Sequence, residues 1–131
     1  MQASPRDYIG KLTTSRIPFY DNRSGKMKVK QRPILVIGVE KDSFPCDFNV
    51  LPVSTISNYH HRDVQFDYEI GKEKCDQMSL KWSPSFIRVH KQSTCYSRDV
   101  DRRYFCDLSK DHSDLYREIV DLHQQFNETL F

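Results

Sequence analysis

The chain has 131 residues, of which 37% are hydrophobic and 29% are charged, and its formal net charge at pH 7 is +2. This length suffices for one domain with one modest core, so we expect residues 1–131 to form a single domain. The eight Phe and seven Tyr residues argue against a disordered chain, and no segment approaches the roughly 20 apolar residues of a membrane-spanning helix.

The charges are unevenly distributed along the chain. Residues 23–32 hold five basic side chains and no acid, residues 79–98 are again basic without an acid, and residues 111–131 hold five acids and one arginine. This separation suits a molecule that binds a polyanion on one face and turns the other to water. Solvated charges scattered over the surface are the alternative.

The cysteines indicate the chemical setting. No two of them form a C-x-x-C pair, and residues 1–12 contain no apolar run typical of a signal peptide. We therefore expect free thiols in a reduced, cytoplasmic setting. His and Cys are not clustered at ligand spacing, so we expect no zinc site and no cofactor.

The first predicted element is cationic. Lys26, Lys28, Lys30 and Arg32 alternate with uncharged residues, so an extended backbone would place all four cations on one face. The apolar, β-branched run PILVIGVE at residues 33–40 is typical of a buried strand, and its proline stands at the first position, where a missing N–H is tolerated.

Two further strands are expected before residue 71. Residues 48–55 (FNVLPVST) predict a strand in which Pro52 indicates an edge or a bulge. Residues 64–70 alternate between apolar and polar, which predicts a half-buried strand with Val64 at the start of its buried face.

The last predicted elements are two strands and a helix. Residues 86–90 predict a strand with Arg88 and His90 on one face, and residues 103–108 predict another. A stripe at helical spacing follows, with Ser113 as the expected N-cap and Asp114 in the first turn. Its apolar members are Leu115, Ile119, Leu122, Phe126 and Leu130. Short strands followed by one helix predict a mainly β fold, a small barrel or sandwich closed by a C-terminal α-helix.

The side chains at the strand ends suit one kind of chemistry. Cleaving RNA without a metal requires a base for the ribose 2′-OH proton, an acid for the leaving oxygen, and donors that stabilise charge on phosphorus. Arg, Lys, His, Ser, Thr and Gln can share these tasks, and all occur within three motifs. The motifs are QRPILVI at residues 31–37, VLPVST at 50–55 and FIRVHKQST at 86–94.

In their order and rough spacing, these motifs and the C-terminal helix make residues 10–131 resemble the PemK/MazF family of toxin–antitoxin ribonucleases. The resemblance implies an SH3-like, CcdB/PemK-like β-barrel that pairs as a homodimer. It also implies sequence-selective cleavage of single-stranded mRNA and a cognate antitoxin protein as partner.

The resemblance further implies that Arg32 and Ser54 carry catalysis, with Thr55 beside them. Serines 83 and 85 stand where some members of the family have an acid, so the base is expected to have moved to His90. We expect RNA contacts from the basic and polar side chains of the motifs and of the preceding lysine stripe. These are Lys26, Lys28, Lys30, Arg88, Lys91, Gln92 and Ser93.

Two other functions fit the same pattern. One is a non-catalytic toxin of this fold that inhibits DNA gyrase through its C-terminal segment, and the other is an RNA-binding module without catalysis. Trp82 also has two interpretations: it stacks on a base, or it packs in the core, which is commoner for a single aromatic side chain.

Overall fold

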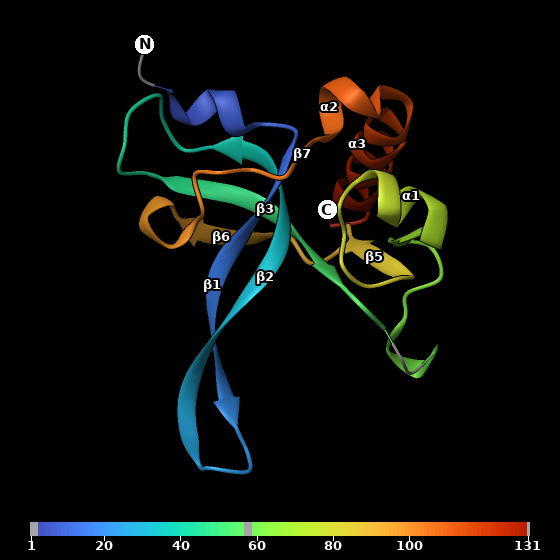
Figure 1. Cartoon of the computed structure of the whole chain (residues 1–131). Coiled ribbons are helices and arrows are strands. Elements are labelled where there is room, and N and C mark those ends of the chain that lie inside the picture. The colour runs from blue at the N-terminus through green and yellow to red at the C-terminus, as the bar shows by residue number, and fades with distance from the viewer. Residues whose placement is uncertain (1–2, 57–58, 131) are drawn as a thin grey trace.

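The computed structural model describes residues 3–56 and 59–130. Within these residues, seven strands form an antiparallel sheet that curls into half a barrel, and helices cover one side of it (Figure 1). The chain is mainly β with a C-terminal helix, so the predicted fold class is confirmed. None of the described helices is both long enough and apolar enough to cross a membrane.

The elements have the following bounds. The strands are β1 (Lys11–Asp21), β2 (Lys26–Val39), β3 (Asp47–Ser54), β4 (Asp67–Ile70), β5 (Ser85–Arg88), β6 (Ser93–Tyr96) and β7 (Cys106–Asp107). The α-helices are α1 (Lys72–Gln77), α2 (Leu108–Asp111) and α3 (Ser113–Glu128). Short 3-10 turns are η1 (Pro5–Tyr8), η2 (Tyr59–His61) and η3 (Ser97–Asp99). The sheet order is β4-β5-β3-β2-β1-β7, and β6 also pairs with β3.

Strand β3 lies at the centre of this arrangement. One side of β3 pairs with β2, while the other side pairs first with β6, through residues 47–50, and then with β5, through residues 53–54. Pro52 falls between these last two ladders, opposite Ile34 of β2. The predicted edge strand is therefore wrong: Pro52 is accommodated in a central strand because it lies where the neighbouring chain leaves the sheet.

The sheet is buried on both faces, which explains the unbroken apolar run of residues 33–40. Leu35 faces a core that includes Leu51 and Ile119 of α3, whereas Ile34 faces a second core that includes Phe48. Successive side chains of a strand point to opposite faces, so a strand covered on both sides has no polar alternation.

The C-terminal helix forms as predicted, with Asp114 in its first turn. Its N-cap is His112 rather than the expected Ser113, because α2 precedes it directly and the backbone changes direction at His112. Leu115, Ile119, Leu122 and Phe126 pack against the core. Leu130 lies beyond the end of the helix and is exposed.

Predicted strands differ in their bounds from those in the structure, and β5 ends at Arg88, so His90 lies in the turn after it rather than in the predicted strand 86–90. Strand β4 begins only at Asp67, and Val64 is 87% exposed. The reason is a turn at residues 63–66, in which the carboxylate of Asp63 accepts hydrogen bonds from the N–H groups of residues 65 and 66. Strand β7 has two residues, since Asp107 caps helix α2 by accepting the N–H of Lys110 at 3.2 Å. Pro33 lies inside β2 rather than at its start.

A long hairpin explains the position of Pro33. Strands β1 and β2 pair from Leu12↔Leu35 to Asp21↔Lys26, and the outer part of the hairpin projects away from the rest of the molecule (Figure 1). The lysine stripe is extended, so its cations share one face as predicted. Lys28 pairs with Asp21 at 2.8 Å on that face, and the exposed apolar side chains of Tyr20, Met27 and Val29 lie on the other.

Candidate functional site

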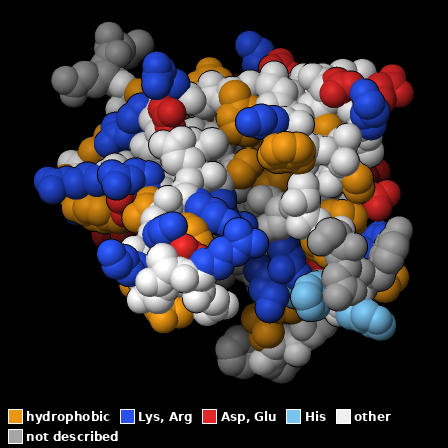
Figure 2. Space-filling model, turned by 60° about the horizontal axis from the view of Figure 1, so that its bottom comes forward, with side chains coloured by type: hydrophobic (Ala, Val, Ile, Leu, Met, Phe, Trp, Pro, Cys, Tyr) orange, Lys and Arg blue, Asp and Glu red, His pale blue; other side chains and the backbone are white. Residues whose placement is uncertain are grey.

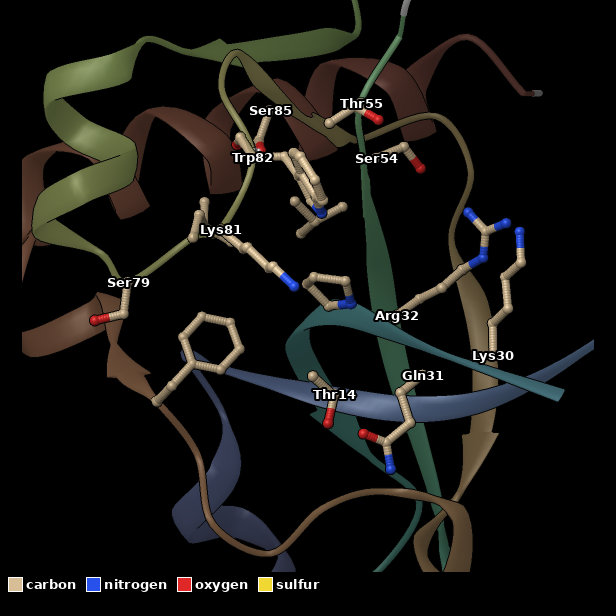
Figure 3. A pocket seen from close by; sticks show the side chains of 14 residues that line it. Thr14, Lys30, Gln31, Arg32, Ser54, Thr55, Ser79, Lys81, Trp82 and Ser85 are labelled. Atoms are coloured by element: carbon tan, nitrogen blue, oxygen red, sulfur yellow. Dashed lines mark hydrogen bonds between the residues drawn. The ribbon is translucent and has the colours of Figure 1, made fainter.

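A basic hollow lies beside the middle of β2 and the end of β3, with a cavity volume of about 640 Å³ (Figure 3). Its cationic side chains are Lys30, Arg32 and Lys81. Its hydroxyl side chains are Thr14, Ser54, Thr55, Ser79 and Ser85. The described lining contains no carboxylate, so the hollow offers an anion several positive charges and donors without a competing acid.

The strand register brings Arg32 and Ser54 together. The β2–β3 ladder ends at the pair Ile34 and Pro52, and Arg32 and Ser54 each lie two residues beyond that pair on their strands. Residues opposite each other in an antiparallel pair point to the same face. In Figure 3 the side chains of Arg32, Lys30 and Ser54 extend to the same side of β3. The structure therefore gathers Arg32, Ser54 and Thr55, as the sequence motifs predicted.

The opposite wall comes from the turn that ends helix α1. The N–H of Leu80 donates to the carbonyl of Cys75 at 2.9 Å, and Ser79 has a φ of 59°, in the left-handed region that favours glycine. This turn buries Leu80 and sends the chain along the rim, where Lys81 and Trp82 face the hollow (Figure 3).

Arg32 is available to a ligand. No hydrogen bond or ion pair joins its side chain to another described residue, and the side chain is only partly exposed. A guanidinium presents a planar fork of donors that matches two oxygens of a phosphate or carboxylate. Lys30 extends beside it, and Lys81 lines the same hollow from the other side of β3 (Figure 3), so the hollow offers cations to a phosphodiester from two directions.

Arg88 and His90 lie outside this hollow, in a cluster around Asp67 of strand β4. The carboxylate of Asp67 is fully buried and accepts a hydrogen bond from Nε of Arg88 at 3.0 Å. Nδ1 of His90 lies 3.7 Å from the same carboxylate, without a hydrogen-bond partner among the described residues. Arg88 also donates to the carbonyl of His61 at 3.0 Å. Both side chains approach one anion, and that anion belongs to the protein; the predicted strand face is wrong for His90, which lies in the turn after β5.

The other predicted RNA-binding residues are spread over the surface. Lys91, Gln92 and Ser93 are exposed in and after the β5–β6 loop. Gln92 forms a hydrogen bond of 2.8 Å to Nε2 of His123 on α3, where burial lowers the pKa of the imidazole. Among the described residues that line the hollow, Lys30 is the one that belongs to the predicted RNA-binding set.

The sequence motifs missed Lys81 and Asp67, and they left two interpretations open for Trp82. Trp82 is 65% exposed, so its interpretation as a core residue is wrong. A signal for Lys81 was present, because residues 79–98 form a basic segment without an acid. Asp67 was visible only as a polar position of the strand at 64–70, and its burial depends on pairing with Arg88 across the β4–β5 ladder.

In residues 3–56 and 59–130, no group of three His, Cys, Asp or Glu side chains is arranged to hold a metal ion. No protein-family model and no curated protein matches the chain. The site is therefore interpreted from its own geometry and from the sequence motifs.

Proposed function

We propose that this protein is a toxin of the PemK/MazF type, an endoribonuclease that cleaves single-stranded mRNA sequence-selectively without a metal. The observation that supports this most is the basic hollow, in which Arg32, Ser54 and Thr55 lie with two lysines and no described carboxylate. Cationic donors in such a site supply the charge stabilisation that a metal provides in other nucleases.

The reaction proposed is an internal phosphoryl transfer. The ribose 2′-oxygen attacks the adjacent phosphorus, the bond to the 5′-oxygen breaks, and the products carry a 2′,3′-cyclic phosphate and a 5′-hydroxyl. The guanidinium of Arg32 stabilises the charge that develops on the phosphoryl oxygens, and the hydroxyls of Ser54 and Thr55 orient the ribose and phosphate.

Proton transfer in this scheme involves water. The described lining contains neither imidazole nor carboxylate, so the 2′-OH gives its proton to a water molecule and the leaving 5′-oxygen takes a proton from water. The role of His90 as acid or base stays a prediction from the sequence motif, and its position beside Asp67 makes it directly testable.

The path of the RNA follows the charges. Lys26, Lys28 and Lys30 share one face of strand β2, and Lys30 reaches the basic hollow. Figure 2 shows Lys and Arg side chains gathered across the middle of the face that carries the hairpin. Such a strip attracts a phosphate backbone regardless of its sequence. By the resemblance, we propose a homodimer in the cytoplasm, with a cognate antitoxin as protein partner.

The test is cleavage of a long single-stranded RNA by purified protein in EDTA, with analysis of the product ends. We expect cleavage at a limited set of sequences and 2′,3′-cyclic phosphate termini. Cleavage that disappears in EDTA and returns with magnesium would overturn this mechanism. Growth inhibition without RNA cleavage would favour the gyrase-inhibiting alternative, and RNA binding without cleavage would favour the binding module.

A further inference from the structure

Trp82 combines an exposed ring with a fixed backbone. The side chain is 65% exposed, while Leu80 and Ser85 on either side of it are buried. The hydroxyl of Ser85 donates to the carbonyl of Trp82, which holds the intervening turn. A large apolar ring that is held out in water forgoes the free energy of burial, and its position at the rim of the basic hollow suggests that a ligand covers it.

The indole lines two cavities of different character. Trp82 and Thr55 line the basic hollow and also a second hollow with a volume of about 490 Å³. The remaining described lining of the second hollow is Ile56, Ser83 and Pro84, which carry no charge. The basic hollow therefore offers cations next to the indole, and the second hollow offers apolar surface with two hydroxyls.

We propose that Trp82 and the uncharged hollow form a nucleobase subsite, in which a base of the RNA stacks on the indole while its neighbouring phosphate lies in the basic hollow. This subsite rests on the proposed function and adds to it the residue that binds a base. A nucleotide matches the two hollows, because its anionic phosphate suits the basic hollow and its flat, uncharged base suits the uncharged hollow.

The chemistry of the indole fits this ligand. Every base has a π-face, so stacking on an aromatic side chain adds affinity with little dependence on base identity. Nζ of Lys81 lies 5.5 Å from the centroid of the Trp82 ring, which keeps a cation for the phosphate next to the stacking surface. The hydroxyls of Thr55 and Ser83 are the groups placed to distinguish one base edge from another.

The single tryptophan of the chain makes the subsite measurable by its own fluorescence. The probe is a random-sequence DNA pool about eight nucleotides long, which lacks the 2′-OH and is not cut by the proposed mechanism. A matched abasic pool has the same phosphates without bases. We expect the DNA pool to change the tryptophan emission, and the abasic pool to bind without changing it.

Affinity measurements on variants complete the test. Trp82→Ala should weaken binding of the DNA pool about 5- to 140-fold, the range that corresponds to one stacked base, and leave binding of the abasic pool unchanged. Trp82→Phe should retain most of the affinity, because it keeps a ring. Tyr96→Ala is the matched control, since Tyr96 is exposed on β6 outside both hollows, and it should bind like the wild type.

The outcomes separate the subsite from the function on which it rests. DNA that binds to the wild type and to Trp82→Ala equally, with unchanged emission, would overturn the subsite and leave the nuclease proposal intact. Equal losses for both pools would show a structural role for Trp82 and would also overturn the subsite. Failure of the DNA pool to bind the wild type would overturn the subsite, and absence of RNA cleavage by the same preparation would overturn the nuclease proposal.

Discussion

Arg32 and Arg88 come from two of the three sequence motifs, and the structure uses them differently. Arg88 is 22% exposed and bound to the fully buried carboxylate of Asp67, whereas Arg32 has no partner among the described residues and lines the basic hollow. The fold thus supplies a carboxylate for one motif arginine and leaves the other without a partner of its own among the described residues. Four variants test this difference between the two arginines.

The largest effect is expected for Arg88→Ala, on stability. Removing the guanidinium leaves the carboxylate of Asp67 buried without its charged partner, which should lower the free energy of unfolding by about 3–5 kcal/mol. Urea denaturation measures the loss. The double variant with Asp67→Ala should recover part of it, because neither charge is then unpaired. Full stability of Arg88→Ala would show that this pair is not structural.

Arg32→Ala should lower activity and leave stability almost unchanged, the reverse of the effect expected on stability for Arg88→Ala. Loss of a charge-stabilising donor should reduce the cleavage rate about 100- to 1,000-fold, while the free energy of unfolding should change by less than about 0.5 kcal/mol. Single-turnover cleavage and urea denaturation measure the two effects. Arg16→Ala is the matched control, because Arg16 is exposed on the other face of the same hairpin and should cleave normally.

His90→Gln tests whether the Asp67 cluster takes part in catalysis. The side chain of His90 is 13% exposed beside Asp67 and packs edge-on against Phe126 of α3, outside the basic hollow. We therefore expect cleavage close to that of the wild type, with both limbs of the pH–rate profile intact. A loss of about 100-fold together with one limb would identify His90 as acid or base and would extend the active site to this cluster.

The smallest effect is expected for the lysine stripe. Neutralising Lys26, Lys28 and Lys30 together should lower the slope of log affinity against log salt by up to about two to three units, since each phosphate contact releases about one counterion. The stability should change little, because the hairpin face is exposed. Titration of a single-stranded RNA at several salt concentrations gives the slope. An unchanged slope would place the hairpin away from the RNA.

The sequence predicted the elements whose burial leaves an apolar signature. Residues 33–40 and 48–55 appear as apolar runs, and the stripe of α3 has helical spacing. Strand β1 has no such signature, because Thr13 and Ser15 are buried polar residues within it; the hydroxyl of Thr13 is satisfied by the carbonyl of Asp101 at 2.7 Å. A polar side chain with a distant partner cannot be recognised as core from its neighbours in sequence.

The candidate site likewise contains residues that the sequence predicted and residues that it did not. Arg32 and Ser54 were predictable because Arg32 precedes the apolar run of β2 and Ser54 ends β3, and the two strands are adjacent in the sheet. Lys81 and Trp82 reach the same hollow through the turn after α1. No pattern in the sequence between β3 and this turn predicts that the turn packs beside β3. The pairing of Asp67 with Arg88 depends likewise on a ladder between separate strands.

The length of the β1–β2 hairpin has a consequence for how the molecule opens. Its inner half pairs strands that are buried in the core, whereas its outer half is a two-stranded ribbon with exposed side chains on both faces, a unit that is only marginally stable in water. The outer half should therefore unfold locally while the rest remains native. Its amide protons should exchange with deuterium well before those of Leu12 and Leu35, and limited trypsin digestion should cut first at the lysines of β2.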